Sequence, residues 1–120
     1  FSSPQRGDMI VFRTSASDGA ALHIRRVIGL PGETVQISGG RILIDGEAYN
    51  EGKDFPMITN PGLAASAVTL ESGEYFVLGD NRNNSEDSRY ADIGMVRKRY
   101  IVGKIWFTCS PFEKLGLTKG

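Results

Sequence analysis

Cysteine and histidine each occur only once in the 120 residues, as Cys109 and His23. A single cysteine excludes an intrachain disulfide. One cysteine and one histidine cannot supply the four ligands of a structural zinc site, so we expect no metal and no other cofactor. A catalytic triad based on histidine would have to use His23.

Net charge and long apolar runs are absent as well. Fourteen basic and fourteen acidic residues cancel, so no net field attracts nucleic acid and we expect no nucleic-acid partner. No apolar run approaches the ~18 residues of a membrane span, and no basic-plus-apolar leader begins at Phe1. From the abrupt opening at Phe1 we expect a trimmed or mature fragment of a longer protein.

The composition that remains is that of a folded, strand-rich domain. Apolar residues make up 40% and charged residues 23% of the chain, which is typical of globular proteins. This length suits one hydrophobic core, so we expect a single domain over residues 1–120. No dozen residues show sustained helical spacing of apolar side chains. Short apolar runs predict strands at 9–12, within 22–30, and at 34–37, 41–44, 74–78 and 100–107.

Turn residues separate these runs. Gly39-Gly40 predicts a hairpin, because tight primed turns need positive φ, and Asp45-Gly46 predicts another turn. Residues 50–63 carry two prolines and predict a loop, while residues 85–89 predict one helical turn at most. The pattern favours a mostly β fold of antiparallel, partly rolled sheets with little helix.

The densest polar segment, residues 79–89, directly follows the strand expected at 74–78. As a residue pattern it fits a solvated turn or a loop stiffened by arginine–carboxylate pairs beside a site. Its sequence, Gly-Asp-Asn-Arg-x-Asn-Ser-x-Asp-Ser-Arg, resembles the signature loop of type I signal peptidases. Arg-Gly-Asp-Met-Ile-Val-Phe at 6–12 and Arg-Arg-Val-Ile-Gly-Leu-Pro-Gly-Glu at 25–33 resemble two further motifs of that family in the same order.

This resemblance spans residues 6 to 107 and implies a membrane-tethered serine endopeptidase. Such enzymes work on the outer face of the bacterial cytoplasmic membrane and remove signal peptides from exported proteins. The resemblance further implies a β-rich fold, a missing N-terminal membrane anchor, and a Ser/Lys dyad without histidine. The lysine of that dyad must be neutral to act as a general base, which requires a desolvated position.

Two departures from the family pattern predict that the chain as it stands does not catalyse. The nucleophile motif, Ser-Met-x-Pro-Thr, is absent upstream of Arg6, and Ser2 and Ser3 do not belong to such a motif. Arg25 occupies the position of the general-base lysine. The pKa of an arginine lies so far above neutrality that it would have to fall by ~6 units, or about 8 kcal/mol, to reach it. Arg25 can therefore serve only as a fixed cation.

The resemblance assigns supporting roles to five residues of the signature loop. Ser85 would place its hydroxyl beside the dyad cation and orient it. Asp87 and Arg89 would form an ion pair that stiffens the loop next to the site. Asp80 and Arg82 would give further structural support.

The strand that leads to Arg25 is the expected binding edge for substrate. By resemblance, Leu22-His23-Ile24 would receive the signal peptide as an added strand. Strand alternation places His23 on the same face as Arg25. No serine or aspartate partner for His23 is visible in the sequence, so a structural role is favoured over catalysis.

Three functions remain open. The chain can belong to a signal peptidase whose serine lies outside it and whose lysine was replaced, or to a non-catalytic relative that assists pilin polymerisation. The third function is that of a self-cleaving repressor. The signature loop and the lack of a DNA-binding segment argue against it. The expected partners are signal peptides or pilin subunits. Loss of the N-terminal part would expose apolar strand edges, so we also expect a homodimer.

Overall fold

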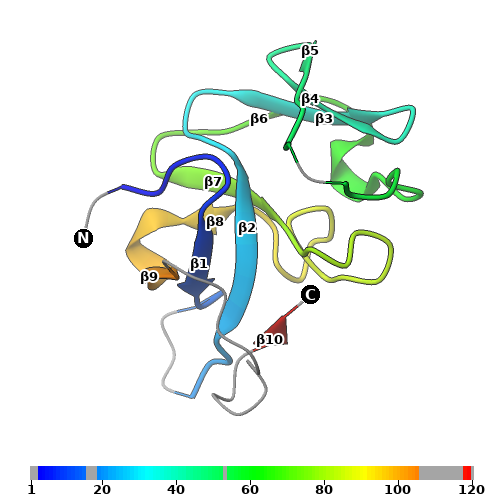
Figure 1. The fold of residues 1–120 in the computed structure, drawn as a ribbon. Helices are drawn as coiled ribbons and strands as arrows, with labels where there is room; N and C mark the ends of the chain where they lie inside the picture. The colour runs from blue at the N-terminus through cyan, green and yellow to red at the C-terminus, as the bar shows by residue number, and fades with distance from the viewer. Residues whose placement is uncertain (1–2, 16–18, 53, 106–117, 120) are drawn as a thin grey trace.

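Strands make up nearly all of the regular structure. The computed structural model describes residues 3–15, 19–52, 54–105 and 118–119, and these contain ten strands and two short 3-10 helices. Neither helix is long and apolar enough to cross a membrane. Figure 1 shows the strands in a larger lower sheet and a smaller upper one. All strand pairs but one are antiparallel, so the expected mostly β, antiparallel fold is confirmed.

The strands follow one another in a simple order within each sheet. Neighbours in the larger sheet are β8 (Val96–Arg97), β7 (Glu74–Leu78), β2 (His23–Gly29), β1 (Met9–Phe12) and β9 (Ile101–Ile105), and β10 (Thr118–Lys119) also pairs with β2. Neighbours in the smaller sheet are β5 (Glu47–Ala48), β4 (Arg41–Ile44), β3 (Thr34–Ser38) and β6 (Val68–Thr69). The 3-10 helices are η1 (Gly62–Ala65) and η2 (Lys98–Tyr100).

Strand β2 lies at the centre of the larger sheet. One of its edges pairs with β1 from His23 to Arg26. On the other edge β7 pairs only with the second half of β2, beginning where Leu78 lies opposite Arg26. The first half of that edge pairs with β10, which runs parallel to it at His23 and Ile24. The chain that leaves β7 therefore emerges beside Arg25.

Two hydrophobic clusters meet at β7. Successive residues of a strand point to opposite faces, so Phe76 and Leu78 join the cluster that includes the smaller sheet, whereas Tyr75 and Val77 join the cluster that includes β1. All four side chains are buried. The end of β7 is thus held on both faces, which fixes the start of the loop that follows.

The two predicted tight turns are present. Gly39 and Gly40 have φ of 60° and 81° and join β3 to β4, where Ser38 pairs with Arg41. Asp45 and Gly46 join β4 to β5 with φ of 51° and 83°. Positive φ at both central residues is what a two-residue hairpin requires.

Residues 85–89 contain no helix, which is consistent with the one helical turn at most expected for this segment. Its polar groups bond within the loop: the Ser85 hydroxyl and the Arg89 amide both donate to the carboxylate of Asp87. The two-residue strands β5, β6, β8 and β10 were not predicted, since two residues carry no periodicity. Of the strand expected at 100–107, β9 covers Ile101–Ile105, and Trp106 and Phe107 lie outside the described residues.

Candidate functional site

Asp87 organises the loop 79–89 from a fully buried position. Its carboxylate accepts hydrogen bonds from the Gly79 amide at 3.0 Å and the Ser85 hydroxyl at 3.1 Å. It also forms a bidentate ion pair with Arg89, whose Nε and Nη2 donate at 2.8 and 2.9 Å. A buried carboxylate needs such partners to compensate its lost hydration. Asp87 therefore ties both ends of the loop together.

Ser88 anchors the same loop to the end of β7. Its hydroxyl accepts a hydrogen bond from the Val77 amide at 2.9 Å, and its own amide donates to the Val77 carbonyl at 3.1 Å. Ser88 is fully buried. The side chain thus continues the hydrogen bonding of the sheet beyond Tyr75, where the pairing of β7 with β8 ends.

Asp80 and Arg82 pair outside the loop. The carboxylate of Asp80 accepts from Nε and Nη2 of Arg26 at 2.9 and 2.8 Å, and this hydrogen bond raises the pKa of Arg26 above its ordinary value. Arg82 is 1% exposed and pairs with Glu51, while its Nη2 lies 4.0 Å from the Asp80 carboxylate. The loop is therefore joined to β2 and to the segment after β5.

Arg25 is buried on β2 next to this loop, with 4% of its surface exposed. Its Nε donates to the Glu86 carbonyl at 2.7 Å, and its Nη1 donates to the Ile24 carbonyl at 2.8 Å. Burial lowers the pKa of the Arg25 guanidinium, and the nearby charges of Asp87 and Glu86 act in the opposite direction. Arg25 is therefore a desolvated cation with the carboxylates of two loop residues nearby.

The residues expected to receive a peptide lie at the start of β2. Leu22 precedes the strand, and His23 and Ile24 are its first two residues and the ones that pair with β10. Ile24 is fully buried, so its backbone rather than its side chain is the part available to an added strand. His23 is half-buried, with its ring centroid 5.6 Å from that of Phe12 on the neighbouring strand.

An open hollow lies beside Ser85. It has a volume of about 430 Å³ and is lined by Asn83, Asn84, Ser85, Glu86, Tyr90 and Asp92. The Ser85 hydroxyl is bonded to Asp87 at its border. The described residues include no group of three or more His, Cys, Asp or Glu side chains placed to hold a metal ion.

The structure thus brings Arg25, the loop residues and the start of β2 to one place in the larger sheet. Sequence reasoning gave no role to three residues that help build it: Arg26, Ser88 and Glu51. Arg26 and Ser88 lie within the quoted motifs, so the motifs could have indicated that these residues belong to the site. Glu51 lies in the segment 50–63, in which no motif was recognised, and nothing in the sequence pairs it with Arg82.

Comparisons with known proteins identify the family of the chain. The family model described as signal peptidase, peptidase S26, matches residues 1–109. The chain is 38% identical to a signal peptidase I of Leptolyngbya laminosa, covering 97% of this chain and 58% of that protein. It is 35% identical to a probable signal peptidase I-2 of Synechocystis sp., covering 95% of this chain and 52% of that protein. The chain therefore spans little more than half the length of these relatives.

A solved structure supports the same assignment. The crystal structure of a signal peptidase I from Enterococcus faecalis V583 superposes with a TM-score of 0.63 at 30% identity, covering 87% of this chain and 97% of that chain. The motifs at 6–12, 25–33 and 79–89 fall in the matched range. The chain belongs to the signal peptidase family, peptidase S26.

Proposed function

We propose that this chain is the peptide-binding part of a signal peptidase-like protein, and that in its present form it binds signal peptides without cleaving them. The observation that carries the proposal is the buried guanidinium of Arg25, at the position where the family pattern has its general-base lysine. A guanidinium has hydrogen-bond donors and no acceptor. Arg25 therefore cannot take a proton from a serine hydroxyl.

The surroundings of Arg25 do not remove this obstacle. Burial is the largest influence on the pKa of Arg25 and lowers it, and the charges of Asp87 and Glu86 oppose this lowering in part. Neutralising the side chain near pH 7 would need a shift of ~6 units, which corresponds to about 8 kcal/mol. The Nε and Nη1 groups of Arg25 donate to backbone carbonyls, so the side chain acts as a donor in these contacts.

Peptide binding would use the first half of the β2 edge, where β7 no longer pairs. The parallel pairing of β10 with His23 and Ile24 supports this proposal, because an added peptide strand would make the same kind of backbone contact. The peptide would take the place of β10 and lie between β2 and the loop that carries Ser85. Backbone hydrogen bonds would supply affinity, and small side chains would enter shallow apolar pockets.

The setting of the whole protein belongs to the same proposal. Residues 1–120 form one domain, and the nucleophile position and a membrane anchor lie in a preceding segment. The domain works on the outer face of the bacterial cytoplasmic membrane, where signal peptides of exported proteins emerge. The ion pairs Asp87–Arg89 and Asp80–Arg26 would keep the loop in shape whether or not the protein cleaves.

A second candidate is a non-catalytic role in pilus assembly, with a pilin subunit as the partner. The combination of a cation that cannot act as a base and an otherwise preserved support loop fits this role equally well. The residue at the nucleophile position discriminates the two: a serine there favours the peptidase, and any other residue favours the pilin-binding role.

The test is cleavage and binding of a labelled signal peptide by the full-length protein in detergent, with and without Arg25→Lys. We expect the wild type to bind the peptide and leave it intact. Turnover gained by Arg25→Lys would show that a serine is present and that Arg25 alone blocks the reaction. If both proteins bind but neither cleaves, the pilin-binding role is favoured.

Two results would contradict the proposal. Cleavage by the wild type would show that Arg25 does not abolish the chemistry, and His23 would then be the next residue to substitute. Absence of peptide binding by both proteins would show that the assigned edge of β2 does not bind the peptide.

A further inference from the structure

Arg82 lies at the beginning of the loop 79–89 and needs a partner from outside it. Its side chain is 1% exposed, and its Nε donates to the Gly79 carbonyl at 2.9 Å. Burying a guanidinium without a negative charge beside it is strongly unfavourable. The nearest acid in sequence, Asp80, is 4.0 Å away and is already bonded twice to Arg26.

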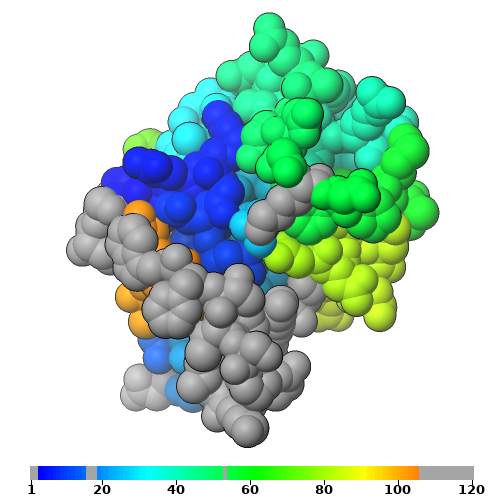
Figure 2. Space-filling model, viewed as in Figure 1, coloured from blue at the N-terminus to red at the C-terminus, as the bar shows by residue number. Residues whose placement is uncertain are grey.

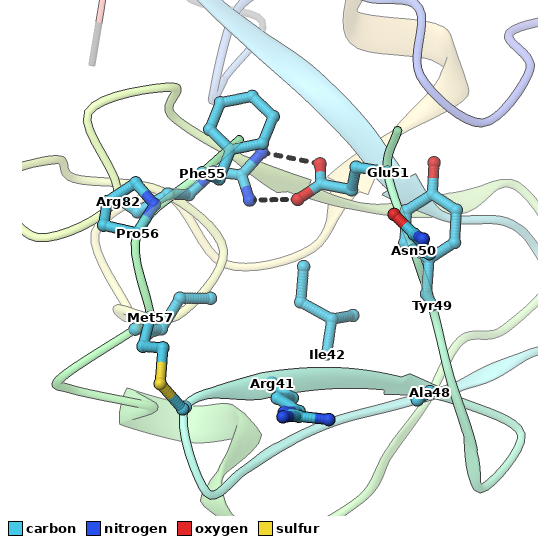
Figure 3. A pocket seen from close by; sticks show the side chains of 12 residues that line it. Arg41, Ile42, Ala48, Tyr49, Asn50, Glu51, Phe55, Pro56, Met57 and Arg82 are labelled. Carbon is cyan, nitrogen blue, oxygen red and sulfur yellow. Dashed lines mark hydrogen bonds and ion pairs between the residues drawn. The ribbon is translucent and has the colours of Figure 1, made fainter. Parts of the chain in front are cut away.

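Glu51 supplies the negative charge. Its two carboxylate oxygens accept from Nη1 and Nη2 of Arg82 at 2.6 and 2.7 Å, the bidentate geometry in which arginine binds carboxylates most strongly. The Glu51 side chain is only 9% exposed, so water screens the pair weakly. The dashed lines in Figure 3 mark this pair at one wall of a hollow of about 340 Å³.

Phe55 closes the outer face of the same guanidinium. The Arg82 Cζ lies 3.9 Å from the centroid of the Phe55 ring, a stacked cation–π geometry. In Figure 3 the ring of Phe55 lies against Arg82 beside the ion pair. We call Glu51 and Phe55 together the Arg82 clamp.

The clamp is one end of a longer contact between segment 51–63 and the loop. The Asn83 side chain accepts from the Thr59 amide at 2.9 Å and donates to the Met57 carbonyl at 3.1 Å. At the other end of the loop, Arg89 donates to the Asn60 carbonyl at 3.1 Å. Figure 2 shows green atoms of this segment packed against the yellow-green atoms of the loop on one face of the molecule.

The loop therefore depends on segment 51–63 for its position, and the loop in turn contacts Arg25. The Glu86 carbonyl that receives Arg25 Nε and the Ser85 hydroxyl both lie on this loop. The Gly79 carbonyl held by Arg82 is at its start, where the chain leaves β7. A displacement of Arg82 would move the loop relative to the first half of β2.

From this geometry we propose that Glu51, assisted by Phe55, is a positioning residue of the peptide site: it holds Arg82 so that the loop 79–89 keeps its distance from β2. This inference rests on the proposed function, since it concerns the same binding edge. It predicts that loss of the Glu51 charge weakens peptide binding in addition to lowering stability.

A matched control is available in the same chain. Arg6 and Glu33 form another bidentate pair, with distances of 2.6 and 2.8 Å. Arg6 also donates to the Ile28 carbonyl and Glu33 also accepts from the Leu30 amide, and both of these partners lie outside the loop 79–89 and the first half of β2. Glu33→Gln therefore removes the same charge from the same kind of pair away from the peptide site. Glu51→Gln and Glu33→Gln can be compared directly, because both keep the side-chain volume.

The experiment measures the affinity of residues 1–120 for a fluorescein-labelled signal-peptide segment ending in Ala-x-Ala, by anisotropy well below the Tm of each variant. We expect Glu51→Gln to weaken binding at least about fivefold, as loss of a charge-assisted hydrogen bond would, and Glu33→Gln to leave it unchanged. Phe55→Leu should weaken binding and Phe55→Tyr, which keeps the ring, should restore it. A purely structural role would move the Tm of both glutamate variants and the affinity of neither.

Hydrogen exchange of the Gly79 amide, which donates to Asp87, gives a readout that needs no peptide. We expect faster exchange in Glu51→Gln and unchanged exchange in Glu33→Gln. Equal affinities of wild type and Glu51→Gln, or equal exchange at Gly79, would overturn the inference. If the wild type itself fails to bind the peptide, the proposed function fails instead, and the inference falls with it.

Discussion

His23 is the residue whose charge can change near neutral pH. Burial is the main cause that lowers its pKa from the ordinary value of 6.5, and the positive charge of Arg25 lowers it further, while Glu86 raises it. The folded protein consequently binds the proton of His23 less readily than the unfolded chain. The stability that neutral His23 contributes is complete above pH 6.5 and is lost as the pH falls below that value.

We therefore predict that replacing His23 reduces the acid sensitivity of the fold. Wild type should lose free energy of unfolding between about pH 7.5 and 5.5, a window in which few carboxylates titrate, and His23→Gln should lose less. Urea denaturation at the two pH values measures the difference. Parallel losses in the two proteins would show that protonation of His23 does not oppose folding.

Single residues also show how far the sequence alone could reach. Asp87 and Arg89 are two positions apart, within a recognised pattern, and the structure places them in one ion pair. Glu51 and Arg82 are 31 positions apart and belong to segments with unrelated patterns. Only the path of the chain after β5 brings them together, so a sequence without structure could not pair them.

At the scale of the strand, Gly29 occupies a position with no room for a side chain. A Cβ there would lie 2.4 Å from Val35 Cγ2, 2.7 Å from Leu70 Cδ1 and 3.1 Å from Phe76 Cβ. These side chains belong to the buried cluster that joins the two sheets. Gly29 also ends β2, after a shift in its register with β7. The absence of a side chain is thus needed for packing.

We predict that Gly29→Ala destabilises the protein by about 1–3 kcal/mol, the usual cost of overpacking a core. Gly103→Ala is the matched control, because Gly103 lies in β9 and its Cβ would meet nothing within 4 Å. There the loss of backbone freedom in the unfolded chain should make alanine stabilising by about 0.5–1 kcal/mol. The midpoints of urea denaturation measure the stability change in each variant. Equal effects of the two substitutions would exclude the packing explanation.

Strands with their own sequence signal were predictable, and those defined by their neighbours were not. β1, β4 and β7 match the predicted runs at both ends, because each has several consecutive strand-forming residues. β5, β6 and β8 have two residues each and exist only as partners of longer strands. Residues 85–89 form no helix, since their polar side chains bind the loop itself instead of capping a helix.

At the scale of the whole molecule, the larger sheet leaves an edge at β9. In the described part of the chain β9 is the last strand of the path that begins with β8. Its Val102 side chain is 52% exposed. An exposed edge strand with an apolar side chain is a template for pairing with another chain. The homodimer expected from the sequence therefore has a candidate surface, with the β9 strands of two copies side by side about a twofold axis.

We predict that residues 1–120 self-associate weakly through this edge, because one short strand gives a small interface. Sedimentation velocity should show a rising average mass with concentration for the wild type and a monomer for Val102→Lys, since a lysine on an edge strand opposes pairing. Leu63→Lys is the control, because Leu63 is 51% exposed but lies on η1, outside both sheets. A monomeric wild type would refute the dimer. Equal loss of association in the two variants would assign it to general apolar exposure instead of the β9 edge.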